Sequence, residues 1–261
     1  MILDGTLFLL LFLVLVILSL TVWMIFSSQL SQSSQLFQSS QVRTLNEWSH
    51  DVIIVANHYN EDLKWLEPFV QNKSAIVCSK KYYSSMCDVP INKGREASGY
   101  LKFIIDNFHN LPKNMAFLHG HEKAYHQKYN ILKLIKCAKI NQYGYFGLNH
   151  CYFDDRKIAT NKIMKEMQKI WYGHFKPFLK RECPIYLLHD CCAQFIVSRE
   201  RVLRNSRGAY QHWYQLLMKT KNDYHLGLVF EYIWHIIFGE PDVVSHEDNA
   251  SRFVLSLLNN K

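Results

Sequence analysis

The apolar positions of this chain form one long uninterrupted run, followed by short runs that alternate with helical stripes. The long run covers residues 6–26 and contains no charged residue. At about 1.5 Å per residue, a helix of this length spans the roughly 30 Å hydrocarbon layer of a bilayer. The chain starts Met-Ile-Leu-Asp without Lys or Arg, and Trp23 lies near the far boundary of the run. These features favour a retained single-span anchor over a cleaved signal peptide.

The composition then changes to Ser and Gln. The sequence SSQLSQSSQLFQSSQV is nearly free of charge and cannot bury enough apolar area to order itself, so it predicts a flexible stem. We therefore expect an anchor at 1–27, a stem at 28–48 and one domain at 49–261. This layout resembles that of type II Golgi glycosyltransferases. The resemblance implies a single-pass membrane protein whose C-terminal domain lies in the ER or Golgi lumen or otherwise outside the cytoplasm.

Within 49–261, short β-branched runs alternate with amphipathic stretches. Residues 51–56, 74–79 and 114–118 are typical of buried parallel strands. Residues 97–108 place apolar side chains at helical spacing. This alternation predicts an α/β fold, a single Rossmann-like domain with a mostly parallel sheet flanked by helices.

The later part of the chain adds more helices and two strands. Residues 154–178 predict one long amphipathic helix that Pro177 ends. Residues 184–199 predict two strands around a polar turn, with Ser198 capping the next helix. Two further helices are expected at 210–218 and 226–238.

Polar side chains follow the first predicted strand. Asn57, Tyr59, Asn60 and Glu61 come directly after the run at 51–56. The carboxyl ends of such strands are where open α/β sheets bind ligands, so these residues are candidates for holding a nucleotide. Asn60 also suits the N-cap of a helix, and the two roles are compatible.

A second polar group precedes the helix predicted at 97–108. It contains Asn92, Gly94, Arg95 and Glu96. Backbone N–H groups around Gly94, together with Arg95, could hold a diphosphate at the start of the helix. The alternative is a surface Arg–Glu pair of little energetic weight.

The third predicted strand ends in His119-Gly120-His121-Glu122. Two side chains two positions apart on an extended segment point to the same side. His119 and His121 are therefore candidates for binding a divalent metal, manganese or magnesium, or a phosphate. The alternative is a cluster of solvated histidines at a helix start.

Glu231 and His235 lie four residues apart inside the very apolar stretch 226–238. A carboxylate in such a run is costly unless it is paired or has a chemical role. Glu231 is therefore the candidate general base. The alternatives are a surface pair between Glu231 and His235, or a carboxylate that caps a backbone group.

Charge and cysteine content add limits on function. The formal charge of +8 fits a solvated basic surface or attraction to phosphates. Nucleic acid is not an expected partner, because no run of Lys or Arg exceeds two residues. Seven cysteines without a Cys-x-x-Cys pair argue against a zinc ribbon. Two N-glycosylation patterns, Asn72-Lys73-Ser74 and Asn249-Ala250-Ser251, are in keeping with a lumenal domain.

Several blocks of the chain resemble a widely distributed family, domain of unknown function 3431. They cover most of residues 52–239 in order, and the family name implies no activity. The matching blocks are Asn57 to Leu66, Asn92 to Ala97, Asn107 to Glu122, Ala193 to Glu200, and Glu231 to Gly239.

The order of these blocks also looks like that of glycosyltransferases with the A-type nucleotide-binding fold. In those enzymes one strand ends in Asp-x-Asp, which holds a metal and the donor diphosphate, and His119-Gly120-His121 stands in that place. The block 193–198, which contains Gln194, looks similar to their later strand ending in Ser. Glu231 looks similar to their acidic pair. With no Asp-x-Asp here, dependence on a divalent metal is in question.

We therefore predict a membrane-anchored glycosyltransferase that moves a sugar from a sugar nucleotide to a hydroxyl of a glycan or protein acceptor. Residues 57–61 and Gln194 would hold the donor, Arg95 with His119 and His121 its diphosphate, and Glu231 would deprotonate the acceptor. Two alternatives remain open. One is a metal-dependent hydrolase using His119, His121 and His126 or His235, and the other is a non-catalytic membrane-tethered protein on a transferase-like scaffold.

Overall fold

The computed structural model describes residues 48–82, 87–124, 127–149, 152–154, 162–190 and 192–254, together with the helical residues Ser19, Thr21 and Met24. The chain divides into two units, Met1–Thr44 and Leu45–Lys261. The anchor predicted at 6–26 and the stem predicted at 28–48 therefore lie almost wholly outside the described residues. Among the residues that are described, no helix has the length and hydropathy needed to cross a bilayer.

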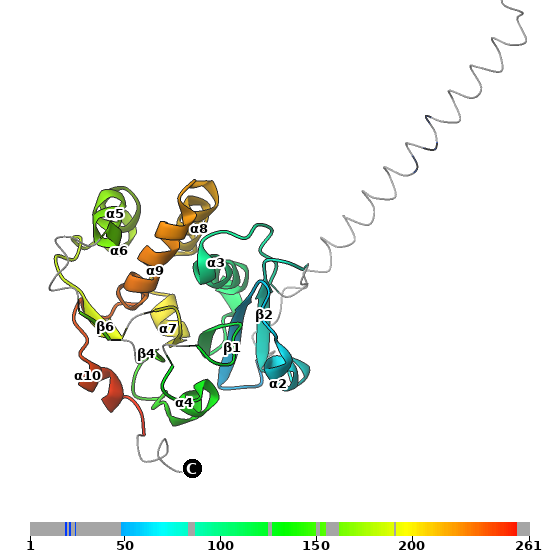
Figure 1. The fold of residues 1–261 in the computed structure, drawn as a ribbon, viewed down its shortest axis with the longest axis horizontal. Coiled ribbons are helices and arrows are strands. Elements are labelled where there is room, and N and C mark those ends of the chain that lie inside the picture. The colour runs from blue at the N-terminus through cyan, green and yellow to red at the C-terminus, as the bar shows by residue number, and fades with distance from the viewer. Residues whose placement is uncertain are drawn as a thin grey trace, which may run out of the picture. The chain divides into compact units, whose positions relative to one another are not determined.

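Five strands form the central sheet in the order β2-β1-β3-β7-β4 (Figure 1). β1 (Val52–His58) pairs in parallel with β2 (Ala75–Ser79) and with β3 (Asn114–His119). β7 (Phe195–Ser198) runs antiparallel to both β3 and β4 (Tyr145–Gly147). The α/β class is confirmed, but the expectation of a mostly parallel sheet is wrong because the sheet is mixed. β7 is an apolar run buried by both layers, so its composition does not indicate its direction.

Helices cover both faces of this sheet. The first face carries three long helices, α3 (Arg95–Asn107), α8 (Arg207–Lys219) and α9 (Asp223–Ile237). The second face carries two short helices, α2 (Glu67–Gln71) and α4 (Ile131–Cys137).

The two cores follow from the alternation of side chains along β1. Ile53 and Val55 belong to the core under the long helices, whereas Ile54 and Ala56 belong to the core under α2 and α4. Successive residues of a strand point to opposite faces, so a strand between two helical layers is apolar throughout. Such continuous runs, and not strict alternation, are what made β1, β2 and β3 visible in the sequence.

Aromatic side chains fix α9 against the sheet. Trp234 is buried, with its ring 5.5 Å from that of Phe195 and 6.0 Å from that of Tyr100. Residues three apart on a helix lie on neighbouring positions of its surface. The burial of Trp234 therefore also sets the direction in which Glu231, one turn earlier, faces.

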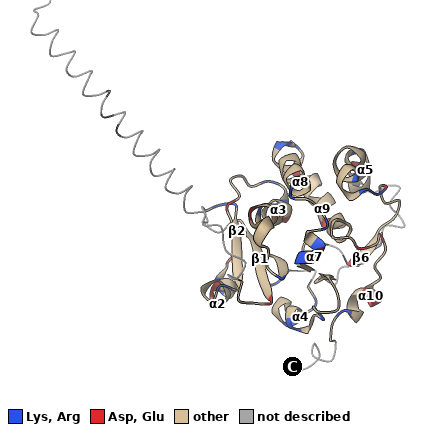
Figure 2. Cartoon of the chain, turned by 180° about the vertical axis from the view of Figure 1, so that it is seen from behind, with Lys and Arg blue, Asp and Glu red and all other residues tan. Residues whose placement is uncertain are grey.

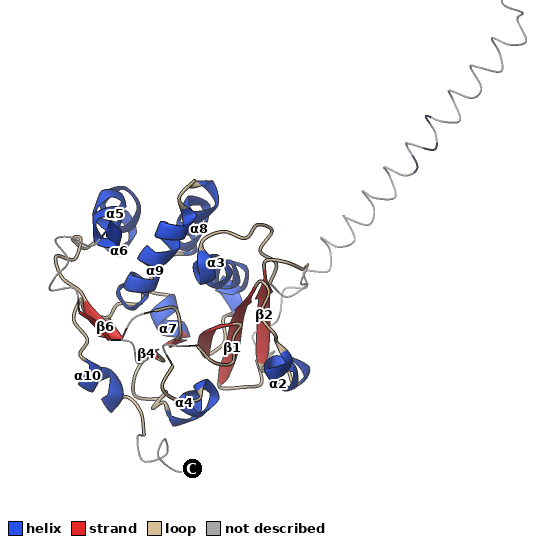
Figure 3. Ribbon diagram, in the orientation of Figure 1, coloured by secondary structure: helices blue, strands red, loops and turns tan. Residues whose placement is uncertain are grey.

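The remaining elements correct one helix prediction. β5 (Tyr152–Asp154) and β6 (Leu188–Asp190) form a separate two-stranded sheet, and α10 (His246–Ser251) lies beside β6 (Figure 3). Asp154 is thus a strand residue, not the start of a helix. The described helical region comprises α5 (Lys162–Ile170), a π-helical turn (Trp171–Phe175) and α6 (Lys176–Leu179). Pro177 lies in the first turn of α6, where a missing N–H group costs nothing.

Two capping predictions have opposite outcomes. Ser198 caps α7 (Arg199–Val202), because its side chain accepts a hydrogen bond from the backbone N–H of Arg201, as predicted. Asn60 caps no helix. The turn after β1 continues to a short 3-10 helix (Lys64–Leu66), and Asp62 accepts the N–H of Lys64 there at 3.0 Å.

The basic residues are spread over separate elements. Lysines and arginines lie on α4, α7 and α8, among other places (Figure 2). This distribution supports the interpretation of the +8 formal charge as a solvated basic surface.

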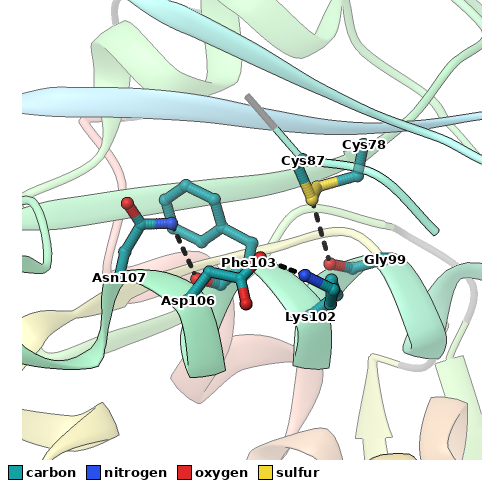
Figure 4. Close-up of a disulfide and its surroundings, with 7 residues drawn as sticks. All are labelled: Cys78, Cys87, Gly99, Lys102, Phe103, Asp106 and Asn107. Atoms are coloured by element: carbon teal, nitrogen blue, oxygen red, sulfur yellow. Dashed lines mark hydrogen bonds and ion pairs between the residues drawn. A yellow bond between two sulfur atoms is a disulfide. The ribbon is translucent and has the colours of Figure 1, made fainter. Parts of the chain in front are cut away.

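A disulfide joins Cys78, which is buried in β2, to Cys87 in the segment before α3. The Cys87 sulfur lies 3.9 Å from the carbonyl oxygen of Gly99, so the bridge sits against α3 (Figure 4). Cys192 is also in a disulfide, whereas Cys137 and Cys183 are free thiols.

Removing the Cys78–Cys87 bridge is expected to lower the free energy of unfolding by about 2–3 kcal/mol, because the bridge closes a short loop in the unfolded chain. The measurement is urea unfolding of the double variant Cys78→Ala/Cys87→Ala without reductant, since reductant would also open the disulfide of Cys192. Cys183→Ala is the control and should shift the midpoint little. An unchanged midpoint in the double variant would contradict this prediction.

Candidate functional site

The carboxyl ends of β1, β2 and β3 meet at one edge of the sheet. In register, Asn57 at the end of β1 lies between Cys78 of β2 and His119 of β3. The Trp65 ring N–H donates to the carbonyl of Gly120 at 2.8 Å and so ties the segment after β1 to the end of β3. We call the polar group at this edge the polar rim, and it consists of Asn57, Glu61, Lys80, Arg95, Glu96, His119, His121 and Glu231.

Arg95 and Glu231 form the centre of the polar rim. Arg95 begins α3 and Glu231 lies in α9, and Nε of Arg95 donates to Oε1 of Glu231 at 2.5 Å. The same Nε lies 3.8 Å from Oε2 of Glu96, and the guanidinium lies 5.3 Å from the centre of the Tyr224 ring. The alternative of a surface pair between Glu231 and His235 does not hold, because the partner of Glu231 is Arg95.

One face of α9 is shaped to receive the Arg95 side chain. Tyr224, Gly227 and Glu231 are spaced three and four residues apart, so they lie on the same side of the helix. A Cβ atom at Gly227 would lie 3.0 Å from Cγ of Arg95. Glycine at this position therefore allows the arginine stem to lie directly on the helix, between the tyrosine ring and the carboxylate.

Glu96 and His119 form the inner part of the polar rim. Their closest approach is 3.5 Å, between Nδ1 of His119 and Oε1 of Glu96. Burial lowers the pKa of His119, and Glu96 only partly opposes this. Burial alone would raise the pKa of Glu96, but His119, Arg95 and Lys80 outweigh it and the pKa lies below its usual value. Glu96 is therefore ionised beside Glu231.

Glu61 closes the outer end of the polar rim. Its Oε2 accepts the backbone N–H groups of Tyr59 and Asn60 at 2.6 and 3.0 Å, and its Oε1 lies 3.9 Å from Nε2 of His121. Burial opposes ionisation, but these hydrogen bonds outweigh it and lower the pKa of Glu61. A Cβ atom at Gly120 would lie 3.0 Å from Cβ of Glu61, so the close approach of the two segments requires glycine.

The predicted metal ligands do not converge. His119 faces Glu96, whereas His121 faces Glu61. The third candidate, His235, packs its ring on that of His189, with centroids 4.0 Å apart. Across the described ranges, no group of three or more His, Cys, Asp or Glu side chains is arranged to hold a metal ion. His126 lies outside those ranges.

The predicted diphosphate site at the start of α3 is only partly available. The Gly94 N–H donates to a carboxylate oxygen of Asp223 at 2.9 Å, so this group is already bound within the protein. Asn92 is exposed beside it, as are Tyr59 and Asn60 after β1. Of the residues predicted for this site, Arg95 and Glu96 belong to the polar rim.

Gln194 connects the polar rim to the antiparallel part of the sheet. Its Oε1 accepts the backbone N–H of His119 at 3.2 Å, and its Nε2 donates to Oδ1 of Asn149 at 3.0 Å. Gln194 is buried, so in this structure it positions the end of β3.

Lys80 is a member of the polar rim that was not predicted from the sequence. Its buried ammonium donates to the carbonyls of Lys93, at 3.1 Å, and Arg95. Gly94 and Arg95 both have positive φ, 68° and 50°, so this turn is strained at Arg95 and needs support. Burial lowers the pKa of Lys80 to about 8, against the opposing effect of Glu96 and Glu61. Lys80 therefore holds the turn that presents Arg95.

The pKa of Glu231 is raised to about 7. Burial is the main cause and the neighbouring Glu96 carboxylate adds to it, while Arg95 opposes both. Glu231 therefore changes protonation close to neutral pH.

This shift gives stability a pH dependence with a defined sign. Because the folded pKa lies above the ordinary value of 4.5, the unfolded chain loses this proton first as the pH rises. The contribution of Glu231 to stability should fall between about pH 4.5 and about pH 7 and then stay constant. Glu231→Gln should therefore gain stability relative to the natural protein across this window. Urea unfolding at about pH 5 and about pH 8 tests this, and an equal difference at both would contradict it.

The fold and the polar rim define an α/β domain with a charged site at the carboxyl edge of its parallel strands. The chain belongs to the family described as protein of unknown function (DUF3431), whose pattern matches residues 53–252. Comparison with curated proteins and with solved structures finds no match in either. The family description names no activity, so the likeness to A-type glycosyltransferases stays a prediction.

Proposed function

We propose that the domain transfers a sugar from a sugar nucleotide to a hydroxyl of a glycan or protein, with the polar rim as its active site. The observation that carries this proposal is the Glu231 carboxylate. It is nearly buried, it lies 2.5 Å from the Arg95 Nε, and its pKa is raised to about 7. A base with a pKa near the working pH is well suited to take a proton from a hydroxyl.

Arg95 supports the proposal as the group that meets the donor diphosphate. Its Nε is engaged by Glu231, but no residue in the described part of the chain accepts a hydrogen bond from either terminal nitrogen. The side chain is 32% exposed. A planar guanidinium can donate to two phosphate oxygens in parallel, so these nitrogens suit a diphosphate beside the base.

In the proposed reaction, ionised Glu231 takes the proton of the acceptor hydroxyl as its oxygen bonds to the anomeric carbon of the donor. The bond from that carbon to the diphosphate oxygen breaks, and the nucleoside diphosphate leaves. Arg95 stabilises the negative charge that develops on the leaving group. Lys80 acts by holding the turn that carries Arg95.

The arrangement of the strands also supports the proposal. β3 ends at His119, where A-type glycosyltransferases have the Asp-x-Asp motif. This strand pairs directly with β7. The segment leading into β7 contains Gln194, which binds the backbone of His119. The blocks compared with transferases are thus neighbours in space, as parts of one site must be.

The test uses the purified full chain in detergent and a panel of sugar nucleotides, with and without manganese and magnesium. We expect at least one sugar nucleotide to raise the melting temperature and to release nucleoside diphosphate when an acceptor is present. If none binds and none is turned over under either condition, sugar transfer is the wrong activity.

The proposed setting is a single-pass membrane protein with this domain outside the cytoplasm. The disulfide between Cys78 and Cys87 supports an oxidising compartment, since such bonds are rare where thiols are kept reduced. The anchor at 6–26 stays a prediction from the sequence.

A further inference from the structure

The two N-glycosylation patterns of the chain have different surroundings. Asn72 is exposed at the C-terminal end of α2, just before β2. Its Oδ1 accepts hydrogen bonds from the backbone N–H of Ser74, at 3.0 Å, and from the Ser74 hydroxyl. Of the two polar atoms of the Asn72 side chain, only the oxygen can accept a hydrogen bond from a backbone N–H. The orientation of the amide is therefore fixed, and Nδ2 points away from the turn.

The Nδ2 atom of Asn72 is also accessible for modification. Within the described ranges it donates no hydrogen bond, and the neighbouring residues 71 and 73 are exposed as well. The Ser74 hydroxyl rests on the amide oxygen, so the asparagine and the hydroxyl residue of the pattern are already in contact. The amide nitrogen is therefore presented to solvent, while the buried Ser74 hydroxyl holds the amide oxygen and also lies 3.2 Å from the Phe69 carbonyl.

Asn249 is used in the opposite way. It is 6% exposed, and its Nδ2 donates to the Gly147 carbonyl at 3.0 Å and to Oδ2 of Asp190 at 2.8 Å. Its Oδ1 accepts the N–H of Gly147 at 3.1 Å. Every polar atom of this side chain is thus engaged in joining α10 to β4 and β6. A glycan on Nδ2 would displace a donor and has no space to occupy.

We infer that Asn72 carries an N-linked glycan and that Asn249 does not. The co-reactant is an oligosaccharide joined to a lipid diphosphate, the donor of the secretory pathway. A bond forms between Nδ2 of Asn72 and the anomeric carbon of this donor, and the bond from that carbon to the phosphate oxygen breaks. The lipid diphosphate leaves and the amide loses one proton, so atoms and charge balance.

Two further observations agree with this inference. The disulfide at Cys78, six residues after Asn72, indicates the oxidising compartment in which such glycans are added. Asn72 precedes the amino end of β2, whereas the polar rim lies at the carboxyl ends of the parallel strands. A glycan at Asn72 would therefore leave the polar rim open. The inference does not rest on the proposed sugar transfer.

The test expresses the full chain in a eukaryotic host and reads the occupancy of each asparagine in the natural sequence. Enzymatic release of glycans in heavy-oxygen water converts an occupied asparagine to labelled aspartate, which peptide mass spectrometry locates. We expect label at Asn72 and none at Asn249. Label at Asn249, or an unlabelled Asn72, overturns the inference. The measurement uses the natural sequence, so it does not require any variant to fold.

Variants provide matched controls for the same experiment. Asn72→Gln and Ser74→Ala should each abolish the mobility shift caused by glycan release, whereas Ser74→Thr should keep it. Asn249→Gln should leave the shift unchanged. A shift that persists in Asn72→Gln and disappears in Asn249→Gln would assign the glycan to the other position.

Discussion

Replacing Glu231 with Gln is expected to lower the rate of sugar transfer by about 10²–10⁴-fold, the usual contribution of a general base. Gln keeps the shape of the side chain and can still accept the Arg95 Nε hydrogen bond, so the fold should survive. What is lost is the ability to take a proton. The measurement is the rate of nucleoside diphosphate release with saturating donor and acceptor.

The pH profile separates a base from a residue that only positions Arg95. With Glu231 present, the rate should rise with pH through about 7, as the carboxylate ionises. The residual rate of Glu231→Gln should lack this rise. Glu200→Gln, an exposed acid on α7, is the matched control and should leave rate and profile unchanged. A normal rate in Glu231→Gln would remove Glu231 from the chemistry and leave the Arg95–Glu231 pair a structural one.

Much of the fold was predictable because burial on both faces has a signature in sequence. The runs that became β1, β2 and β3 are continuous and apolar, and the stripe that became α3 has helical spacing. The direction of β7 was not predictable, because an apolar strand between two layers has the same composition in either direction. Asp154 was misassigned because β5 is only three residues long and directly precedes residues with helical periodicity.

The polar rim was partly predictable for a geometric reason. Parallel strands bring their carboxyl ends to one edge, so polar residues after β1 and β3 had to lie near each other. Glu231 could be identified from the sequence because a carboxylate within an apolar helix is costly unless it is paired or has a chemical role. Lys80 was not visible, since only the folded chain brings its ammonium to carbonyls thirteen and fifteen residues later. The partner of Glu231 was not predictable either, because sequence spacing offered only His235 as an alternative, whereas tertiary packing places Arg95 there.

Replacing Glu240 with Gln is expected to lower the free energy of unfolding by about 3–5 kcal/mol, the usual cost of removing one member of a buried ion pair. Glu240 is 5% exposed and binds Arg201 at 2.9 Å and Arg252 at 2.8 Å through separate oxygens. The two arginines also donate to the carbonyls of Gly239 and Tyr145. Glu240 thus joins the end of α9 to α7, α10 and β4. The measurement is the urea midpoint together with the slope of the transition.

Asp242→Asn is the matched control for this prediction. It removes a carboxylate two residues away that is also paired with an arginine, Arg181. Both members of that pair are about one third exposed, so water can solvate the arginine left behind and the cost should stay below about 1 kcal/mol. Both variants remove one negative charge that is paired with arginine. A difference between their losses of unfolding free energy therefore reports the effect of burial. Equal losses in the two variants would mean that water also reaches the two arginines around Glu240, against the burial seen here.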